Sequence, residues 1–307
     1  MGQPVSMANR TTLKDLVSKK QVFAPCVWDC MSARAAQMAG FEAILLSGAA
    51  TAYSMIGTPD IGMLTADELI YATERITATC PLPLIVDGDD GYGDSPLNVY
   101  RTCYRLARGG AMAITIDDST GIRGFERLLV DNGYRSGICS REQFYAKINA
   151  ALEATKGTDC IIIARTHAIR REGLDGCIER LVQAEKLGAQ MSLVIGINNL
   201  DQCRQINASL PGWKMYPDVG VHDGKPDVEL EDIEKLGFNL VTMHYLEKAS
   251  LYGMMKFGKE NYKNKSTVYS ETFDMEGLVP DIPWVEYYEF GGYPEWLKLE
   301  AELRDRR

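Results

Sequence analysis

The sequence has few histidines, no paired cysteine motif and no long hydrophobic run. Only three histidines occur in 307 residues, and none of the eight cysteines forms a CxxC pair, so a zinc site is not expected. No apolar segment reaches the roughly 18 residues that cross a bilayer, and the N-terminal segment lacks the apolar core of a secretory signal. We therefore expect a cytoplasmic protein with reduced thiols and no membrane partner.

Clusters of basic residues are absent as well. The net charge is −9, with 33 Lys and Arg residues against 42 Asp and Glu residues. A chain of this charge without a basic patch is not expected to bind nucleic acid. The hydrophobic content of 46% is ordinary for a globular protein and sufficient for a large core.

Strand-like and helix-like segments alternate along most of the chain. Eight such units with short connections predict a (β/α)8 TIM-type barrel. An open doubly wound sheet is disfavoured because the first turn, VWDCMSA, is not a GxGxxG motif. The expected strands are 22–27, 43–47, 84–87, 113–117, 160–165, 192–195, 213–216 and 240–243. The expected helices are 32–39, 65–79, 98–108, 141–155, 174–187, 199–208 and 228–236.

Two segments interrupt this alternation. The loop 119–139 is far longer than a usual connection between a strand and a helix, which predicts a lid over the catalytic face of the barrel. The tail, residues 258–307, has no strand partner, carries many aromatic residues and ends in an expected helix over 295–304. We expect a catalytic domain over 1–257 and a helical tail that packs on another subunit.

Acidic residues follow two of the expected strands. In LPLIVDGDDGYG, residues 82–93, an apolar strand leads into Asp87 and Asp89, and in AITIDD, residues 113–118, another strand leads into Asp117. So much negative charge is costly unless a cation or hydrogen bonds compensate it. Carboxylate oxygens at the C-terminal end of a strand suit Mg²⁺ and an anionic substrate. Because both strands deliver carboxylates to the same rim, the pattern predicts an active site there.

Further short motifs occur in a fixed order over about residues 22–256. They are Trp28-Asp29 before SAR at 32–34, Ser47-Gly48, GTPDIG at 57–62, the DGDDGYG turn, the IDD strand end and IIIART at 161–166. Together they resemble the isocitrate lyase/phosphoenolpyruvate mutase superfamily. The resemblance implies a modified barrel that binds Mg²⁺ and makes or breaks C–C or P–C bonds of 2-oxo or 2-hydroxy acids. It also implies a C-terminal helix exchanged between subunits of a homotetramer, a dimer of dimers.

The resemblance implies a metal site made of four aspartates. Asp87 would bind Mg²⁺ directly, and Asp60, Asp89 and Asp117 would support it directly or through water. The family usually has Glu at the position of Asp117. The shorter side chain favours a bridging water at that position.

The resemblance also implies a binding site for a substrate carboxylate. Ser47 and the backbone amides of Gly48 and Ala49 would cradle this group, and Arg165 would bind it as a bidentate fork. Trp28, at the end of the first strand, is a candidate for the wall of the pocket.

Several positions depart from the family pattern. The flap GIRGFER, residues 121–127, lacks both the Lys-X-Cys-Gly-His motif of the lyases and the Lys-Thr-Asn motif of the mutases. Leu45 and Ile195 stand where the family has an aromatic residue and Glu, and His167 replaces an Asp after ART. Without the flap cysteine, the general acid is open. The candidates are Arg123, which does not readily give up a proton, His167 and Tyr134; a low-pKa thiol at Cys139 is a further candidate.

Three hypotheses about function follow. The first is an Mg²⁺-dependent lyase that cleaves a C–C bond of a small dicarboxylate, a substituted malate or oxaloacetate, through an enolate. The second is a P–C bond enzyme, a phosphonomutase or phosphonopyruvate hydrolase, whose phosphonate would meet Arg123, Arg127 and Arg135 of the flap. The third is a barrel that binds a carboxylate without catalysis. The missing flap cysteine favours this third hypothesis, whereas the retained carboxylates oppose it because unneeded buried acids destabilise a fold.

Overall fold

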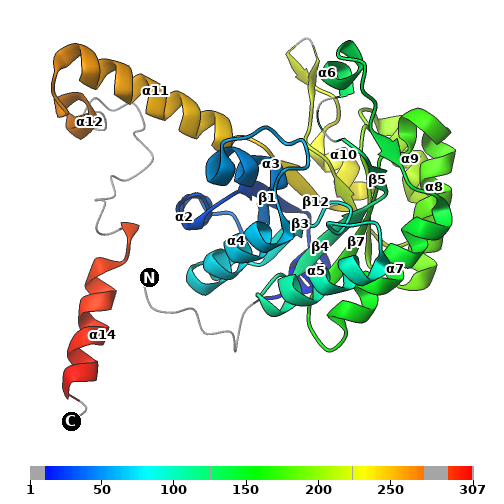
Figure 1. Cartoon of the computed structure of the whole chain (residues 1–307), viewed down its shortest axis with the longest axis horizontal. Coiled ribbons are helices and arrows are strands. Elements are labelled where there is room, and N and C mark those ends of the chain that lie inside the picture. Colours follow the sequence, from blue (N-terminus) through cyan, green and yellow to red (C-terminus); the bar gives the residue numbers. More distant parts are fainter. Residues whose placement is uncertain (1–10, 123, 125, 223, 273–289, 306–307) are drawn as a thin grey trace. The chain divides into compact units, whose positions relative to one another are not determined.

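Eight parallel strands close into a barrel in the computed structural model, which describes residues 11–122, 124, 126–222, 224–272 and 290–305 (Figure 1). The order around the barrel is β1-β12-β9-β8-β7-β4-β3-β2. The predicted (β/α)8 barrel is confirmed, and all eight expected strands are present within two residues at either end. These strands are β1 Val22–Val27, β2 Ile44–Leu46, β3 Leu84–Asp87, β4 Ala113–Asp117, β7 Ile161–Thr166, β8 Met191–Val194, β9 Trp213–Tyr216 and β12 Phe238–Met243.

The helices surround the barrel, and all but α8 and α10 of those named below begin at a residue whose side chain caps the helix. At the start of α4, Thr65 and Glu68 form a capping box: Thr65 Oγ1 accepts from the Glu68 amide, and Glu68 accepts from the Thr65 amide. The segment α8 consists of two helical stretches divided at Gly173, whose φ of 70° and ψ of −177° are not helical and suit glycine; the second stretch coincides with the helix expected over 174–187. The helices of the barrel are α2 Cys30–Met38, α3 Gly48–Thr51, α4 Ala66–Thr79, α5 Pro96–Arg108, α7 Arg141–Thr155, α8 Ile169–Leu187, α9 Leu200–Ser209 and α10 Leu230–Lys235.

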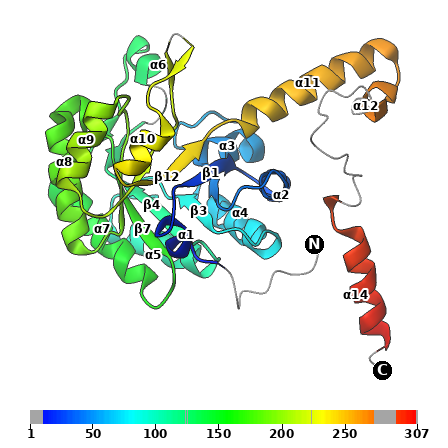
Figure 2. The same ribbon diagram turned by 180° about the vertical axis from the view of Figure 1, so that it is seen from behind.

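The core of the barrel is built from every second residue of its strands. In β1, for example, Val22, Ala24 and Cys26 belong to one buried cluster with Ile85 of β3. The short helix α1, Leu13–Val17, adds its two buried residues to the same cluster and lies close to the strands (Figure 2). This alternation, which follows from the strand period of two, continues to the ends of the strands and determines which residues face the barrel interior there.

Three connections contain structure that the sequence did not predict. A π-helix, Ala52–Ile56, follows α3. Within the loop 119–139, the two-stranded ribbon of β5 Ser119–Thr120 and β6 Gly137–Ile138 forms the base, and α6 spans Glu126–Asp131. A second ribbon, β10 Val221–His222 with β11 Lys225–Pro226, follows β9.

The chain divides into two compact units, one of residues 6–244 and one that contains Tyr245 onward. The second unit includes α11 Leu246–Asn264, α12 Val268–Thr272 and α14 Tyr293–Asp305, so the predicted boundary at 257/258 falls inside a continuous helix. The expected helix over 295–304 is confirmed as part of α14. In the described parts of the chain, no helix is both long and apolar enough to cross a membrane.

Candidate active site

Several of the candidate side chains lie at the C-terminal ends of the barrel strands, at the alternate positions that face the barrel interior. Ile85 belongs to the barrel core, and Asp87 follows two residues later on β3. In the same way, Ala113 of β4 and Ile163 of β7 belong to the core and lead to Asp117 and Arg165. Because neighbouring strands are parallel, these groups meet at one end of the barrel.

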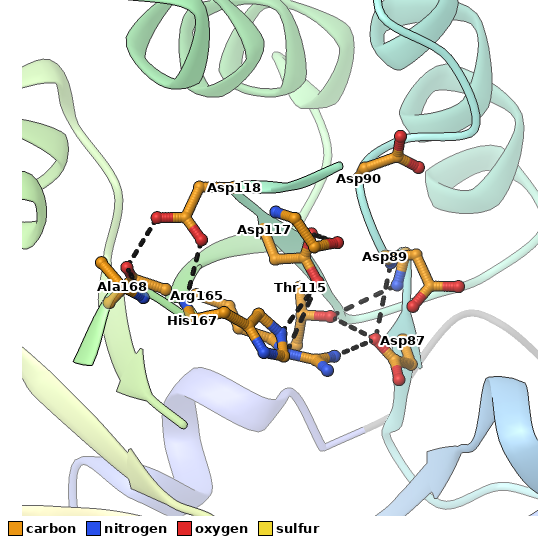
Figure 3. A network of polar contacts seen from close by, with 12 residues as sticks. Asp87, Asp89, Asp90, Thr115, Asp117, Asp118, Arg165, His167 and Ala168 are labelled. Atoms are coloured by element: carbon orange, nitrogen blue, oxygen red, sulfur yellow. Dashed lines mark hydrogen bonds and ion pairs between the residues drawn. The ribbon is translucent and has the colours of Figure 1, made fainter. Parts of the chain in front are cut away.

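Arg165 lies between two carboxylates. Its Nη1 donates to Asp87 Oδ1 at 2.6 Å, and its Nε lies 3.7 Å from Asp117 Oδ2 (Figure 3). Thr115 Oγ1 also donates to Asp87 Oδ1, at 2.9 Å, and Ser119 donates through N and Oγ to Asp117 Oδ1 at 2.9 and 2.6 Å. The positive charge of the guanidinium and these hydrogen bonds compensate the two acids.

His167 lies against the same group. Its Nε2 is 3.1 Å from Arg165 Nε, which donates to it, and 3.2 Å from Asp117 Oδ2. A neutral imidazole with its hydrogen on Nδ1 accepts the bond from Arg165, whereas an imidazolium donates to Asp117. The position of His167 therefore places a proton-carrying group directly between an arginine and a buried carboxylate.

Gly48 leaves space beside two carboxylate oxygens. A Cβ added to Gly48 would lie 3.5 Å from Asp89 Oδ2 and 4.0 Å from Asp87 Oδ2. Ser47, which is buried, caps α3 by accepting a bond from the Ala50 amide at 3.2 Å, and so fixes the backbone of this cradle. Ala49 follows as the second residue of α3.

The turn after β3 holds Asp89 in a backbone conformation that its neighbours stabilise. Asp89 has φ of 50°, and its carbonyl accepts a bond from the Asp117 amide at 2.8 Å. Lys147, fully buried on α7, donates to the Asp90 carbonyl at 2.9 Å and lies 3.6 Å from the Asp90 carboxylate. A Cβ on Gly88 would lie 2.5 Å from the Thr115 carbonyl, so this position requires glycine. The turn is thus rigidly attached to β4 and α7.

Asp118 points away from the mouth, toward α8. Its Oδ2 accepts from Thr166 Oγ1 at 2.6 Å and lies 3.4 Å from Arg180 Nη1. Its Oδ1 accepts from the His167 amide at 2.9 Å (Figure 3). Burial raises the pKa of Asp118 above its ordinary value, against the hydrogen bonds that favour its ionised form. Asp118 therefore positions the backbone of His167.

Arg180 connects Asp118 to the base of the loop 119–139. It donates to the Cys139 carbonyl at 3.1 Å and to Glu172 at 2.5 and 3.1 Å. The Cys139 amide in turn donates to the Asp118 carbonyl at 2.8 Å. Burial raises the pKa of the Cys139 thiol to about 11, so the hypothesis of a low-pKa thiol acid at this position is wrong.

The remaining predicted residues are Arg123, Asp60, Tyr134 and Trp28. Arg123 lies outside the described residues. Asp60 lies in the loop 57–62, and its carbonyl O is 3.6 Å from the position of a Cβ on Gly124, so this loop borders the flap. Tyr134 is exposed, and Trp28, which is partly buried, donates from its amide to Ser32 Oγ at 3.0 Å.

Carboxylate oxygens suit a hard cation such as Mg²⁺, although the four aspartates predicted to bind it do not all lie close together. Among the described residues, no three of the predicted ligands have carboxylate oxygens within 4.8 Å of one another. The Oδ2 atoms of Asp87 and Asp89 nevertheless both face the space beside Gly48, and oxygen ligands of this kind suit Mg²⁺. Arg165 supplies the compensating charge between Asp87 and Asp117 in this structure.

One ionisable pair at this end of the barrel has no counterpart in the sequence-based prediction. His244, directly after β12, donates from its amide to Asp218 Oδ1 at 3.0 Å, and its Nδ1 contacts Asp218 Oδ2. The alternation of residues along the strand could have indicated His244, because Leu240, four residues earlier, belongs to the barrel core. Asp218 lies in a connection between elements, where this alternation does not apply.

Comparisons with known proteins agree with the fold and the motifs. The phosphoenolpyruvate phosphomutase family matches residues 13–257. Petal death protein of Dianthus caryophyllus is 30% identical over 310 residues, covering 98% of this chain and 91% of that protein. 2,3-Dimethylmalate lyase of Eubacterium barkeri is 29% identical, covering 76% of this chain and 79% of that protein. The structure of oxaloacetate acetylhydrolase with the inhibitor 3,3-difluorooxalacetate has a TM-score of 0.80 at 25% identity, covering 95% of this chain and 96% of the other. With the barrel, the strand-end carboxylates and these matches in agreement, the chain belongs to the phosphoenolpyruvate mutase/isocitrate lyase superfamily.

Proposed function

We propose that this protein is an Mg²⁺-dependent lyase that cleaves a C–C bond of a small 2-hydroxy or 2-oxo dicarboxylate through an enolate. The observation that carries the proposal is the cradle at Gly48, where the Oδ2 atoms of Asp87 and Asp89 face one space, next to a guanidinium that binds carboxylates. The similar proteins support the substrate class, since one is a lyase of 2,3-dimethylmalate and another a hydrolase of oxaloacetate.

Four aspartates hold the metal in this proposal. Asp87 and Asp89 offer their Oδ2 atoms, and Asp117 and Asp60 act directly or through water. When bound, Mg²⁺ supplies positive charge to the 2-oxo and carboxylate oxygens of the substrate, which lowers the energy of the developing enolate.

The chain's own residues bind and orient the substrate. Ser47 and the amides of Gly48 and Ala49 bind its carboxylate, and Arg165 provides two parallel N–H donors for the same group or its neighbour. Trp28 lines the pocket. Arg165 donates to Asp87 and lies close to Asp117, so these two acids fix the position of its guanidinium.

His167 is the proposed proton donor to the enolate. Its Nε2 lies within reach of both Arg165 Nε and Asp117 Oδ2, at 3.1 and 3.2 Å, so the imidazole can hold a proton in the mouth of the barrel. Arg123 contributes positive charge from the flap, because a guanidinium remains protonated. The loop 119–139 covers the mouth and excludes water.

Turnover of a substrate panel with and without Mg²⁺ tests the proposal. The panel contains oxaloacetate, substituted malates, 2-methylisocitrate and phosphonopyruvate, and pyruvate and phosphate are followed separately. Metal-dependent pyruvate without phosphate is the expected result. Phosphate release would instead establish P–C chemistry, and binding of these acids without turnover by protein that holds Mg²⁺ would establish a non-catalytic barrel.

A matched pair of variants links the result to the cradle. Asp87→Asn removes one charge at the site and should abolish metal-dependent turnover. Asp201→Asn changes an exposed residue of α9 that pairs with nearby Arg204, and should leave turnover unchanged. Equal activity of both variants would refute the role of Asp87.

We also propose that the protein is a cytoplasmic homo-oligomer, a dimer of dimers. The support is the number of large apolar side chains that α11 and α14 leave exposed; they are Leu251, Tyr252, Met254, Met255, Tyr262, Tyr293, Trp296, Leu297 and Leu303. Such surfaces are typical of subunit contacts. Light scattering of the full chain tests the oligomer, and a monomer at micromolar concentration would refute it.

A further inference from the structure

The pair of His244 and Asp218 is a fixed unit at the rim of the barrel. One carboxylate binds the same histidine twice: Asp218 Oδ1 accepts from the His244 amide at 3.0 Å, and Oδ2 contacts the ring Nδ1. The two side chains are 45% and 40% exposed, so a ligand can reach them. The contact at Nδ1 places a hydrogen on that atom and turns Nε2 to the other side of the ring.

His244 belongs to the interior face of the barrel. Strand β12 pairs with β1 so that Val22 lies opposite Leu240 and Ala24 opposite Thr242. Val22, Ala24 and Leu240 are all part of the barrel core, and the same parity leads to Cys26 and His244. A ring nitrogen of His244 lies within 4.8 Å of Cys26 Sγ, as this parity requires.

The barrel order places His244 on the wall opposite the carboxylates. Between β12 and β4 lie β9, β8 and β7 on one side, and β1, β2 and β3 on the other. His244 at the end of β12 thus faces the end of β4, where Asp117 lies, across a barrel whose interior is only wide enough for side chains or one small ligand.

A dicarboxylate needs a donor at each end. The first end has Arg165 and the cradle at Gly48. On the interior parity of β8 and β9, the strand ends lead to Ile195, which packs against the apolar core, and to Pro217, neither of which has a side chain that donates a hydrogen bond. On this stretch of wall, His244 is the residue that can bind an anion.

We propose that His244, positioned by Asp218, binds the second carboxylate of the substrate and so determines that the enzyme prefers dicarboxylates. The inference rests on the proposed function and adds the residue that recognises the far end of the substrate. The carboxylate of Asp218 stabilises the charged imidazolium, which donates from Nε2 to the substrate. Asp218 is a positioning residue because it acts through His244.

Two ligands of different length test the inference by calorimetric titration of the Mg²⁺-loaded protein. Oxalate, whose two carboxylates are directly bonded, reaches only the cradle, whereas 3,3-difluorooxaloacetate carries its second carboxylate two carbons farther along the chain. We expect His244→Ala to weaken binding of difluorooxaloacetate by about 10-fold or more, the value of a charged hydrogen bond, and to change oxalate binding by less than about 2-fold. His244→Gln, which keeps a donor, should recover part of the loss.

Asp218→Asn tests the positioning role with the same ligands. The asparagine carbonyl can still accept from the His244 amide but does not stabilise an imidazolium, so we expect a selective loss for difluorooxaloacetate smaller than that of His244→Ala. Asp201→Asn is the control and should bind both ligands like the wild type. Equal weakening of both ligands, or no weakening of either, would overturn the inference.

The result also separates this inference from the proposed function. A wild type that binds difluorooxaloacetate through His244 but turns over no compound of the panel refutes the lyase and supports the inference. A wild type that turns over a dicarboxylate while His244→Ala binds both ligands normally refutes the inference alone. A wild type that binds neither ligand refutes both.

Discussion

Replacement of Gly48 by alanine separates the space in the cradle from the stability of the fold. The new Cβ would lie 3.5 Å from Asp89 Oδ2 and 4.0 Å from Asp87 Oδ2, which are ordinary contact distances. Gly48 is the first residue of α3, where alanine is favoured over glycine by at most about 1 kcal/mol. We therefore expect an unfolding free energy equal to or slightly above that of the wild type, with a melting temperature raised by no more than about 4 °C.

The same methyl group should impair binding. It fills the space that both Oδ2 atoms face, so any ligand atom in contact with these oxygens must compete with it. A loss of about 1.4 kcal/mol, which is tenfold in affinity, is the smallest effect we expect on Mg²⁺ binding and on kcat/KM. Calorimetric titration with Mg²⁺ and turnover of the substrate are the two assays.

Gly253→Ala provides the matched control. Gly253 lies inside α11, and a Cβ there meets no atom within 4 Å, so the variant should gain helix stability and keep wild-type Mg²⁺ affinity. A folded Gly48→Ala protein with wild-type affinity and turnover would refute the assignment of the cradle. An unfolded one would refute the distance argument that the fold has room.

Three further changes have defined outcomes. Gly88→Ala places a Cβ 2.5 Å from the Thr115 carbonyl and should cost about 3 kcal/mol of unfolding free energy, seen as a lower urea midpoint; an unchanged midpoint would contradict the clash. The hydrogen bonds of Arg180 hold the pKa of Glu172 below its ordinary value, so its stabilising effect is present above that value and is lost as the pH falls through the lowered one. Glu172→Gln should accordingly destabilise the protein at neutral pH, and this destabilisation should shrink as the pH falls below the ordinary pKa of a glutamate. A difference in unfolding free energy from the wild type that is the same at neutral and at acidic pH would contradict this. When free Mg²⁺ is present at about 100 times its Kd, its removal with EDTA should lower the unfolding free energy of the wild type by about 2.7 kcal/mol and its melting temperature by several degrees. The same treatment should leave the stability of Asp87→Asn unchanged.

The barrel could be predicted because each of its strands is an apolar run that ends in a turn or a polar residue. In a parallel sheet covered by helices, both faces of a strand are buried, so a run such as IIIART at 161–166 has one interpretation when helical segments flank it. The base ribbon of the loop 119–139 was missed because its strands, β5 and β6, have two residues each, too few for a period to show. The loop itself was found by its length alone.

The site could be predicted only in part, because contacts between strands depend on register. The sequence selects Asp87, Asp117, Arg165 and His167 as candidates, but the bridge that Arg165 makes between the two acids requires the register that places Asp117 opposite Arg165. His244 was not predicted for the same reason. That its side chain lies on the interior side of β12 can be inferred only once Leu240 is known to lie opposite Val22.

Asp117 and Asp118 show how one sequence motif divides between two tasks. Successive residues of a strand face opposite sides, so Asp117 enters the mouth beside Arg165, and Asp118 turns outward to Arg180. Each acid is compensated by its own arginine, and Asp118 binds both the His167 amide and, through its carbonyl, the Cys139 amide. The outward acid thus holds the proposed proton donor and the base of the flap in one unit, whereas the inward acid lies in the mouth beside Arg165.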